Sequence, residues 1–173
     1  MINTKISGVH LVKLKRYEDA RGFFFEACRA SWIGAEHRWV QSNISRSSAG
    51  VVRGLHFHHK QTDYWVVVEG HLQVALVDVR KGSSTHRAAI CLDLDSADPH
   101  ALVIPPGVLH GYRAIIDTTM MYLLDHEYDA TDEHAVRWND SALGLPKSWY
   151  QMPPPILSAR DAAAPPLAKI EET

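Results

Sequence analysis

The chain has 173 residues, of which 46% are apolar and 22% are charged, and its formal net charge is −2. This length suits one domain with a real core, and the near-neutral charge gives no sign of a nucleic-acid or membrane-surface partner. No apolar stretch approaches the ~20 residues of a membrane span, and the N-terminus lacks the pattern of a signal peptide. Cys28 and Cys91 lie among apolar neighbours and are too few for a disulfide framework. We therefore expect a single cytoplasmic domain over residues 1–173 with two buried free thiols.

Short β-strands are predicted one after another through the first two thirds of the chain. Alternating and β-branched segments indicate them, and Gly, Pro and Asp residues separate them. The Glu69-Gly70 pair between two such segments indicates a hairpin. No 3.6-residue apolar period persists between residues 51 and 128, which argues against a helix there. The pattern favours a mainly β sandwich or jelly roll, with strands expected at 9–14, 23–28, 41–48, 51–58, 64–68, 71–79, 87–94, 101–104, 112–116 and 120–128.

The pattern changes after Tyr128. Residues 130–138 are compatible with a turn or short helix, and residues 141–150 and 158–164 each indicate a helical turn. Three prolines at 153–155 form a semi-rigid spacer between those two segments. From residue 165 onward we expect a loosely ordered tail. Helical structure is therefore expected only as short segments near the C-terminus.

The segment VRGLHFH, residues 52–58, brings polar side chains into an apolar strand. Residues alternate across a strand, so Arg53 and Leu55 are expected on one face, and His56 and His58 on the other. The segment IPPGVLHGY places His110 just after a Pro-Pro-Gly turn. Two histidine-bearing segments separated by several strands predict a polar pocket in the mouth of a small barrel. A charged residue such as Arg53 in an apolar strand usually has an anion to bind.

The histidine spacing is also compatible with a metal site. His56-x-His58, then Asp63 and later His110, resembles the metal motif of cupins, in which histidines and a carboxylate bind a divalent ion. Two histidines with one carboxylate suit iron or manganese, and a third histidine suits several metals. For any single histidine, a hydrogen-bonded residue of the barrel is the alternative.

Eight segments occur in a fixed order between residues 23 and 163: FFFEA, QSNISRS, GVVRGLHF, VDVRKGSST, IPPGVLHGY, MMYLLDHEYD, RWND and ILSARDAA. Together they resemble the dTDP-4-dehydrorhamnose 3,5-epimerase family over most of the chain. The resemblance implies a cupin jelly roll and an isomerase of the EC 5.1.3 type. It implies a dTDP-linked 4-keto-6-deoxy sugar as substrate, a place in deoxysugar (rhamnose-like) biosynthesis, and no metal or other cofactor.

The resemblance implies catalytic roles for three residues. His56 corresponds to the general base, Asp161 to the carboxylate that orients it, and Tyr122 to the acid on the opposite face of the sugar. Epimerisation beside a ketone removes a carbon-bound proton and returns one on the other face, so it needs such a base and acid. From the residues alone, Tyr122 is also compatible with an ordinary sheet tyrosine and Asp161 with a helix cap.

The resemblance also implies how the substrate is held. Arg53 and His110 correspond to groups around the sugar and phosphates, and Tyr128 to the ring that stacks on thymine. Arg21 and Glu26 correspond to residues that reach the neighbouring subunit's site in a homodimer whose N-terminal strands are exchanged. The full set of substrate-binding residues that the resemblance implies is Arg21, Glu26, Gln41, Asn43, Arg53, His110, Tyr128, Glu133 and Arg160.

One position departs from the family's pattern close to the reaction centre. The family places a lysine in a Q-x-K segment after GLHF, where it contacts the substrate near the reacting ketone, and this chain has Asp63 there. An ionised aspartate would repel a developing enolate, so Lys60, His58 or His59 would have to supply the donor. A second departure, Arg160 in place of a lysine, keeps the charge and changes the donor geometry.

These departures leave alternatives open beside epimerisation at both C3 and C5. The enzyme would invert only one of the two centres, or act on a different nucleotide sugar. A metal-dependent cupin enzyme using His56, His58, Asp63 and His110 is a different class, and a catalytically silent sugar-binding cupin is another. We expect the metal-free epimerase, because Tyr122 and Asp161 suit epimerase chemistry and have no role at a metal.

Overall fold

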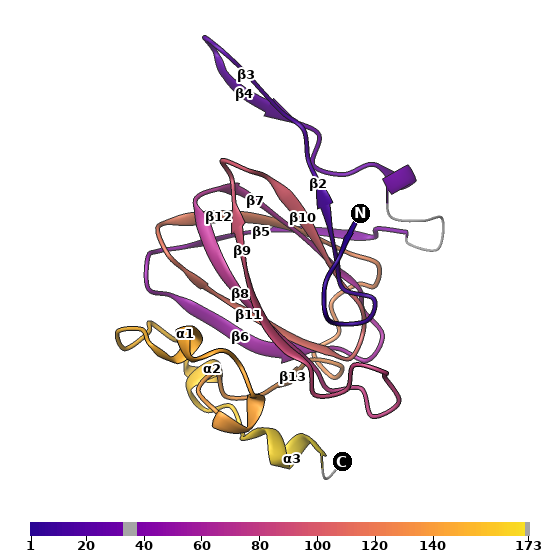
Figure 1. Cartoon of the computed structure of the whole chain (residues 1–173), viewed down its shortest axis with the longest axis vertical. Coiled ribbons are helices and arrows are strands. Elements are labelled where there is room, and N and C mark those ends of the chain that lie inside the picture. The colour runs from indigo at the N-terminus through magenta and orange to yellow at the C-terminus, as the bar shows by residue number, and fades with distance from the viewer. Residues whose placement is uncertain (33–37, 172–173) are drawn as a thin grey trace.

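The computed structural model describes residues 1–32 and 38–171, which form a sandwich of two antiparallel sheets (Figure 1). The larger sheet holds, in spatial order, β1 (Ile2–Asn3), β2 (His10–Lys13), β10 (His100–Ile104), β7 (Asp63–Glu69), β12 (Thr118–Leu124) and β5 (Gln41–Ser47). The smaller sheet holds β13 (His134–Ala135), β6 (Val52–Phe57), β11 (Val108–Ala114), β8 (His71–Asp78) and β9 (Ala89–Asp95). The mainly β fold expected from the sequence is confirmed.

The core between the two sheets is built from alternate residues of the central strands. Trp65 of β7 and Leu102 of β10 lie in one apolar cluster with Leu72 of β8 and Tyr112 of β11. All four side chains are at most 5% exposed. Alternation along each strand aims every second side chain inward, so this cluster holds the two sheets together.

The outer face of each sheet is covered as well. Leu55 and Val77 on the outside of the smaller sheet pack against Trp149 and Leu167 of the C-terminal region. Tyr64 on the outside of the larger sheet packs in a cluster that includes Trp32 of the short 3₁₀ turn η1 (Ala30–Trp32). Because central strands are buried on both faces, their sequences are almost continuously apolar rather than alternating.

The hairpin predicted at Glu69-Gly70 is wrong. The strands on either side, β7 and β8, belong to different sheets, so this turn carries the chain from one sheet to the other. Gly70 has φ +98°, and a Cβ there would lie 2.4 Å from the carbonyl oxygen of Asp117. The turn therefore requires glycine, because any side chain would collide with the backbone of residues 117–118. The local sequence of this crossover turn is the same as that of a hairpin turn, so the two could not be told apart.

Short helices follow the sheets. Three of them, η2 (Ser141–Leu143), α1 (Lys147–Tyr150) and α2 (Ala159–Ala162), lie in the segments where the sequence predicts helical turns, whereas α3 (Leu167–Glu171) was not predicted. Residues 134–135, expected in a turn or short helix, instead pair with β6 as β13.

The loosely ordered tail expected from residue 165 is wrong over 165–171. The side chain of Leu167 is fully buried, and its backbone N–H donates to the carboxylate of Asp140 at 2.8 Å. The backbone N–H of Arg137 donates to the carbonyl of Pro165 at 2.9 Å. This segment is ordered because an apolar side chain anchors it against the outer face of the smaller sheet, and residues 172–173 lie outside the described residues.

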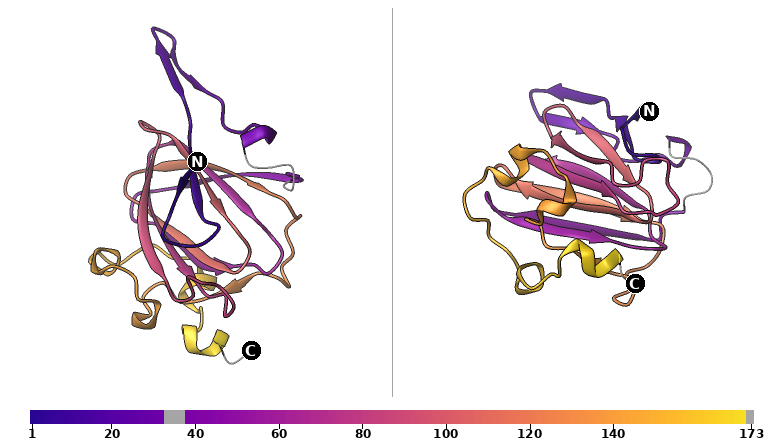
Figure 2. Two further views of the ribbon diagram at one scale, coloured as in Figure 1. Left: turned by 45° about the vertical axis from the view of Figure 1, so that its right-hand side comes forward. Right: turned by 60° about the horizontal axis from the view of Figure 1, so that its bottom comes forward.

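A two-stranded hairpin projects from the sandwich. It is formed by β3 (Arg16–Asp19) and β4 (Gly22–Phe25), and it extends beyond the ends of both sheets in Figure 1 and in the left view of Figure 2. Tyr17, Phe23 and Phe24 are between 47% and 63% exposed on it. A two-stranded ribbon of this kind is not stable by itself in water, and these aromatic side chains are left largely uncovered within one chain.

The structure bears on two expectations from composition, the state of the cysteines and the lack of a membrane-spanning segment. Cys28 and Cys91 are free thiols, as expected, but both are half-buried rather than buried. Among residues 1–32 and 38–171, no helix has the length and apolar character needed to span a membrane.

Candidate active site

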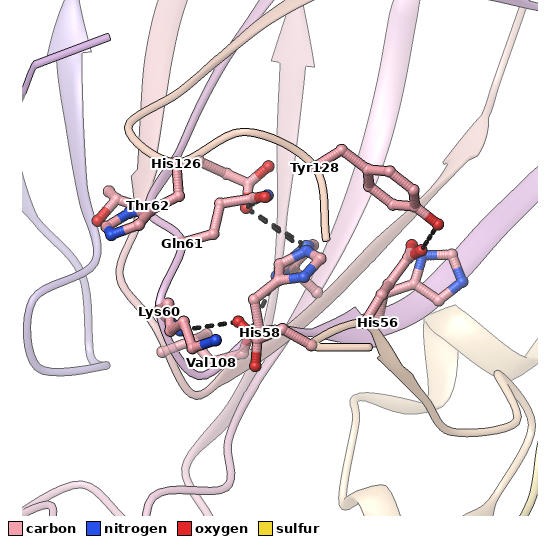
Figure 3. A network of polar contacts seen from close by, with 12 residues as sticks. His56, His58, Lys60, Gln61, Thr62, Val108, His126 and Tyr128 are labelled. Atoms are coloured by element: carbon pink, nitrogen blue, oxygen red, sulfur yellow. Dashed lines mark hydrogen bonds and ion pairs between the residues drawn. The ribbon is translucent and has the colours of Figure 1, made fainter. Parts of the chain in front are cut away.

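A pocket of about 580 Å³ is lined by residues of both sheets. Arg53, His56 and His110 line it from the smaller sheet. Asn43, Asp63 and Tyr122 line it from the larger sheet. The C-terminal segment from Ile156 to Asp161 closes another side. In Figure 3, His56 and Tyr128 lie on one side of this space and Gln61 on the other, with His58 between them.

The predicted alternation of Arg53 and His56 onto opposite faces is wrong, because both line the pocket. His110 of β11 pairs with His56, whereas Tyr112 pairs with Arg53, so the register shifts by one residue between them. Such a bulge inserts one extra residue and returns Arg53 to the side of His56. Gly54, at φ +105°, permits this because a Cβ there would lie 2.9 Å from the Cα of Gly111.

His56 forms a close pair with Asp161. Its Nε2 lies 2.7 Å from the Asp161 Oδ1, although the two residues are 105 positions apart in the chain. Burial alone would raise the pKa of Asp161, but the hydrogen bond and charge of His56 hold it below its usual range. An ionised carboxylate at this distance fixes the orientation of the imidazole and stabilises its protonated form.

Asp161 is not the cap of its helix. Ser158 takes that position at the start of α2, and its hydroxyl accepts a hydrogen bond from the Asp161 backbone N–H at 3.0 Å. The carboxylate is 6% exposed and is left to face His56. The cap alternative for Asp161 is therefore wrong. In the Ser-Ala-Arg-Asp turn, Ser158 caps the helix and Asp161 pairs with His56.

Glu133, Tyr128 and Arg160 form a network next to His56. The Glu133 Oε2 accepts from the Tyr128 hydroxyl at 2.8 Å, drawn in Figure 3, and from the Arg160 guanidinium at 2.6 Å. Burial would raise the pKa of Glu133, but these two donors hold it below its usual range. The other carboxylate oxygen of Glu133 lies 3.6 Å from the Nδ1 of His56. The ring of Tyr128 is 54% exposed, so its face is available for stacking.

Tyr122 lies on the wall opposite His56. It belongs to β12 in the larger sheet, where it pairs with Asn43 of β5 and Trp65 of β7. Burial raises the pKa of Tyr122, and the nearby Asp63 raises it further. The hydroxyl therefore keeps its proton at neutral pH and is able to donate it into the pocket.

Polar side chains for an anionic or carbonyl-rich ligand surround the opening. Arg53 donates to the Ser47 hydroxyl at 3.0 Å and to the Arg46 carbonyl at 3.3 Å, so its charge meets neutral oxygens. Gln41 donates to the Asn43 side chain at 3.0 Å. Asn43 lines the pocket, whereas Gln41 lies behind it and accepts from the Tyr128 backbone N–H at 2.9 Å.

Two of the predicted binding residues lie away from this pocket within one chain. Arg21 is at the tip of the projecting hairpin, with a side chain 89% exposed and paired with Asp19. Glu26 pairs with Arg29 and lines a smaller cavity beside Trp32. Neither is among the residues that line the pocket around His56. Their predicted role in a neighbouring subunit stays a prediction.

The structure brings together three of the four residues in the metal alternative. The Nε2 of His58 lies 3.8 Å, and the Nε2 of His110 lies 3.9 Å, from the same Asp63 oxygen, Oδ2. Burial lowers the pKa of both His58 and His110 to about 4, so both imidazoles are neutral at pH 7. Burial raises the pKa of Asp63, against the opposing effect of His58 and of hydrogen bonds from Gln61 and Trp65. His56 is not a member of this group.

The three residues that were expected to replace the missing lysine differ in whether they line the pocket. Lys60 is 64% exposed and lies 3.7 Å from Asp129, outside the pocket. The ring of His59 packs against Phe57 and His134, also outside it. Only His58 lines the pocket, and its imidazole is neutral.

Several pocket residues were not singled out from the sequence. Trp65 packs edge-on against His110 at 5.3 Å between ring centroids, and Tyr112 bonds the hydroxyls of Ser45 and Ser47. Both aromatic residues look like ordinary buried strand residues in the sequence. Ile156 and Leu157 line the pocket because residue 156 bridges to Val51, a long-range contact without a local signal.

Comparison with known proteins identifies the family of this chain. The profile of the dTDP-4-dehydrorhamnose 3,5-epimerase family matches residues 3–169. A spore coat polysaccharide biosynthesis protein of Bacillus subtilis, SpsL, is 38% identical over 144 residues, covering 81% of this chain and 95% of that protein.

Two solved structures superpose over 99% of this chain. One is the dTDP-6-deoxy-D-glucose-3,5-epimerase RmlC of Legionella pneumophila in complex with dTDP-4-keto-L-rhamnose, with TM-score 0.89, 31% identity and 94% of that chain covered. The other is ChmJ, a 3′-monoepimerase from Streptomyces bikiniensis in complex with dTDP-quinovose, with TM-score 0.91, 29% identity and 90% covered. With a profile match over nearly its whole length, this chain belongs to the dTDP-4-dehydrorhamnose 3,5-epimerase family.

Proposed function

We propose that the protein is an epimerase of a dTDP-linked 4-keto-6-deoxy sugar in deoxysugar biosynthesis. The observation that carries the proposal is the His56–Asp161 pair on one wall of the pocket and Tyr122 on the other, contributed by different sheets. Family membership and the dTDP-sugar complexes of two relatives support the substrate class.

The chemistry follows from this arrangement. His56 removes the proton from the carbon next to the C4 ketone, and the electron pair of the C–H bond forms the enolate. Asp161 stabilises the imidazolium that results. Tyr122 then donates its proton to the same carbon from the opposite face, which inverts the centre, and proton exchange with solvent resets both groups.

The remaining polar residues bind the nucleotide part. Arg53 offers a guanidinium whose partners are neutral oxygens, which suits a diphosphate. The half-exposed ring of Tyr128 suits stacking on a thymine base, and Glu133 and Arg160 hold that ring in place. Asn43, with Gln41 behind it, and His110 complete the polar lining.

We further propose that the protein is a homodimer in which the β3–β4 hairpin of each chain extends to the other chain. The supporting observation is the projecting ribbon with exposed Tyr17, Phe23 and Phe24 (Figure 2). In such a dimer Arg21 and Glu26 would complete the partner's pocket. We place the enzyme in the cytoplasm, which suits its two free cysteines.

The test is incubation with dTDP-4-keto-6-deoxyglucose in heavy water. The proposal predicts deuterium at C3, C5 or both, with loss of this exchange in His56→Ala at unchanged nucleotide binding. Deuterium at both centres assigns double epimerisation, and deuterium at one assigns single epimerisation. Tight binding of the sugar nucleotide without deuterium uptake would show a silent sugar-binding protein and refute the enzyme.

A further inference from the structure

Both ring nitrogens of His56 lie close to a carboxylate, but at different distances. The Nε2 lies 2.7 Å from the Oδ1 of Asp161, within hydrogen-bond range, and the Nδ1 lies 3.6 Å from the Oε1 of Glu133, outside it. Asp161 is held in its ionised form and only accepts, so the Nε2 of a neutral His56 carries the proton. The lone pair is then on Nδ1, which is therefore the atom of the general base that takes the substrate proton.

The carboxylate of Glu133 is fixed through one oxygen and open through the other. Its Oε2 accepts from the Tyr128 hydroxyl at 2.8 Å (Figure 3) and from the Arg160 guanidinium at 2.6 Å. Within residues 1–32 and 38–171, no side chain or backbone group donates to its Oε1. The side chain is only 11% exposed. The position of Oε1 is therefore set by Tyr128 and Arg160, and its lone pairs remain available to His56.

The contact between Glu133 and His56 depends on whether Nδ1 carries a proton. In neutral His56 both Nδ1 and Oε1 are acceptors, so no hydrogen bond joins them. After Nδ1 has taken a proton it is a donor on a cation, and a small movement would bring the two atoms to the ~2.7–2.9 Å of a charge-assisted hydrogen bond. Asp161 accepts from His56 in both states, whereas Glu133 gains its bond only in the charged state. Interactions that strengthen on the way to the transition state are the ones that accelerate a reaction.

We propose that Glu133 is a positioning residue for the general base, which stabilises the imidazolium of His56 at Nδ1 while the enolate forms. This role rests on the proposed function. The C–H bond next to the ketone breaks, its electron pair forms the enolate, and its proton moves to Nδ1. Glu133 accepts a hydrogen bond from that N–H and does not take the proton, because Arg160 and Tyr128 keep its carboxylate ionised.

The other imidazoles near His56 do not compete for this role. His58 and His110 both interact with it electrostatically, and burial lowers the pKa of each to about 4. Both rings are therefore neutral at pH 7 and neither oppose nor balance a positive charge on His56. The negative charges that face the imidazolium are those of Asp161 on one side of the ring and Glu133 on the other.

Three substitutions separate this role from simple support of the nucleotide site. Glu133→Gln keeps the shape of the side chain and removes its charge. Tyr128→Phe is the matched comparison, because it removes the hydrogen bond between Tyr128 and Glu133 from its other end and leaves the charge beside His56. Glu127→Gln is the control for loss of a carboxylate nearby in the chain, since Glu127 is exposed and is not among the residues that line the pocket.

The experiment measures binding and proton removal separately. Calorimetric titration with dTDP gives the nucleotide affinity, and deuterium uptake in a single turnover at saturating dTDP-4-keto-6-deoxyglucose gives the rate of proton removal. We expect Glu133→Gln to lower the saturated rate by about 10- to 100-fold, the size of one hydrogen bond to a charged group, and to weaken dTDP binding no more than Tyr128→Phe does. Glu133→Asp restores the charge at a longer distance and should recover part of the rate, whereas Glu127→Gln should match the wild type.

Two results would overturn the role of Glu133. One is a saturated rate in Glu133→Gln equal to that in Tyr128→Phe, which would leave Glu133 as a support of the nucleotide site only. The other is an equal loss of rate in Glu127→Gln, which would trace the effect to the loop and not to the contact with His56. If Glu133→Gln does not fold, Glu133→Asp carries the same comparison with Tyr128→Phe. Both results require a wild type that exchanges deuterium, so they are distinct from failure of the proposed function, in which the wild type takes up none.

Discussion

Replacing Asp161 by Asn tests the pairing on which the mechanism depends. The substitution keeps the size and shape of the side chain and removes its negative charge 2.7 Å from the His56 Nε2. An amide also offers either an oxygen or an N–H to the imidazole, so it no longer fixes one tautomer. The fold is expected to survive, because the helix α2 is capped by Ser158 and not by Asp161.

The expected loss of rate follows from the distance between His56 and Asp161 and from the burial of their side chains. Two unit charges 2.7 Å apart attract by about 1.5 kcal/mol in water and by about 6 kcal/mol at an effective dielectric constant of about 20. The His56 side chain is 20% exposed and that of Asp161 is 6% exposed, so the pair lies between these limits. A loss of about 2–4 kcal/mol of imidazolium stabilisation corresponds to about a 30- to 1,000-fold lower rate of proton removal.

The assay is the rate of deuterium uptake from heavy water into the bound sugar, measured in a single turnover so that product release does not interfere. Ser158→Ala is the control, because it removes the cap of the same helix and leaves the carboxylate in place. It should lower stability by about 1 kcal/mol and slow exchange by less than tenfold. Exchange in Asp161→Asn at a rate equal to that of Ser158→Ala would refute the charge pairing.

Three further changes test other parts of the structure. Tyr122→Phe should keep the fold and nucleotide affinity and lower net inversion by about 10²–10⁴-fold, with less effect on exchange at the His56 face; unchanged product formation would make Tyr122 a packing residue. Mixed subunits of Arg21→Ala and His56→Ala should recover activity in the heterodimers, and no recovery after verified subunit exchange would place the whole pocket within one chain. Asp78→Asn should lower the free energy of unfolding at pH 7 by about 2 kcal/mol. Burial raises the pKa of Asp78, but hydrogen bonds, chiefly from Arg80, hold it well below its usual range, so its contribution is present above about pH 4 and is lost as the pH falls below that value. Urea unfolding of both proteins at pH 7 and pH 3 measures this difference, and an equal difference at both pH values would contradict the assignment.

Most strands of the two sheets were predictable from apolar segments between turn residues, although β11 begins at Val108 rather than at 112 and β12 ends at Leu124 rather than at 128. Their connections were not. Glu69-Gly70 has the composition of a hairpin, yet Gly70 serves a crossover whose backbone passes against residues 117–118. The tail beyond residue 165 was misjudged for a similar reason, since Leu167 is one apolar residue whose burial depends on a distant partner, the outer face of the smaller sheet.

The site was only partly accessible from the residues alone. Strand periodicity assigned Arg53 and His56 to opposite faces, and a single extra residue at the Gly54 bulge reversed this. The pairing of His56 with Asp161 spans 105 positions and came from the family resemblance, because no local pattern links the two. The grouping of His58, Asp63 and His110 was visible as spacing, but separating His56 from that set required the distances.

The carboxylates of the pocket differ in whether a basic side chain is paired with them. Asp161 is matched by His56, and Glu133 by Arg160, so each has a counterpart within the chain. Asp63 instead accepts hydrogen bonds from Gln61 and Trp65, and the imidazoles of His58 and His110 lie 3.8 and 3.9 Å from it. Burial raises the pKa of Asp63, which favours its neutral form. Arg53 donates to the Ser47 hydroxyl and to the Arg46 carbonyl, which are neutral oxygens. Its positive charge is therefore available to balance the diphosphate of the proposed substrate at the pocket.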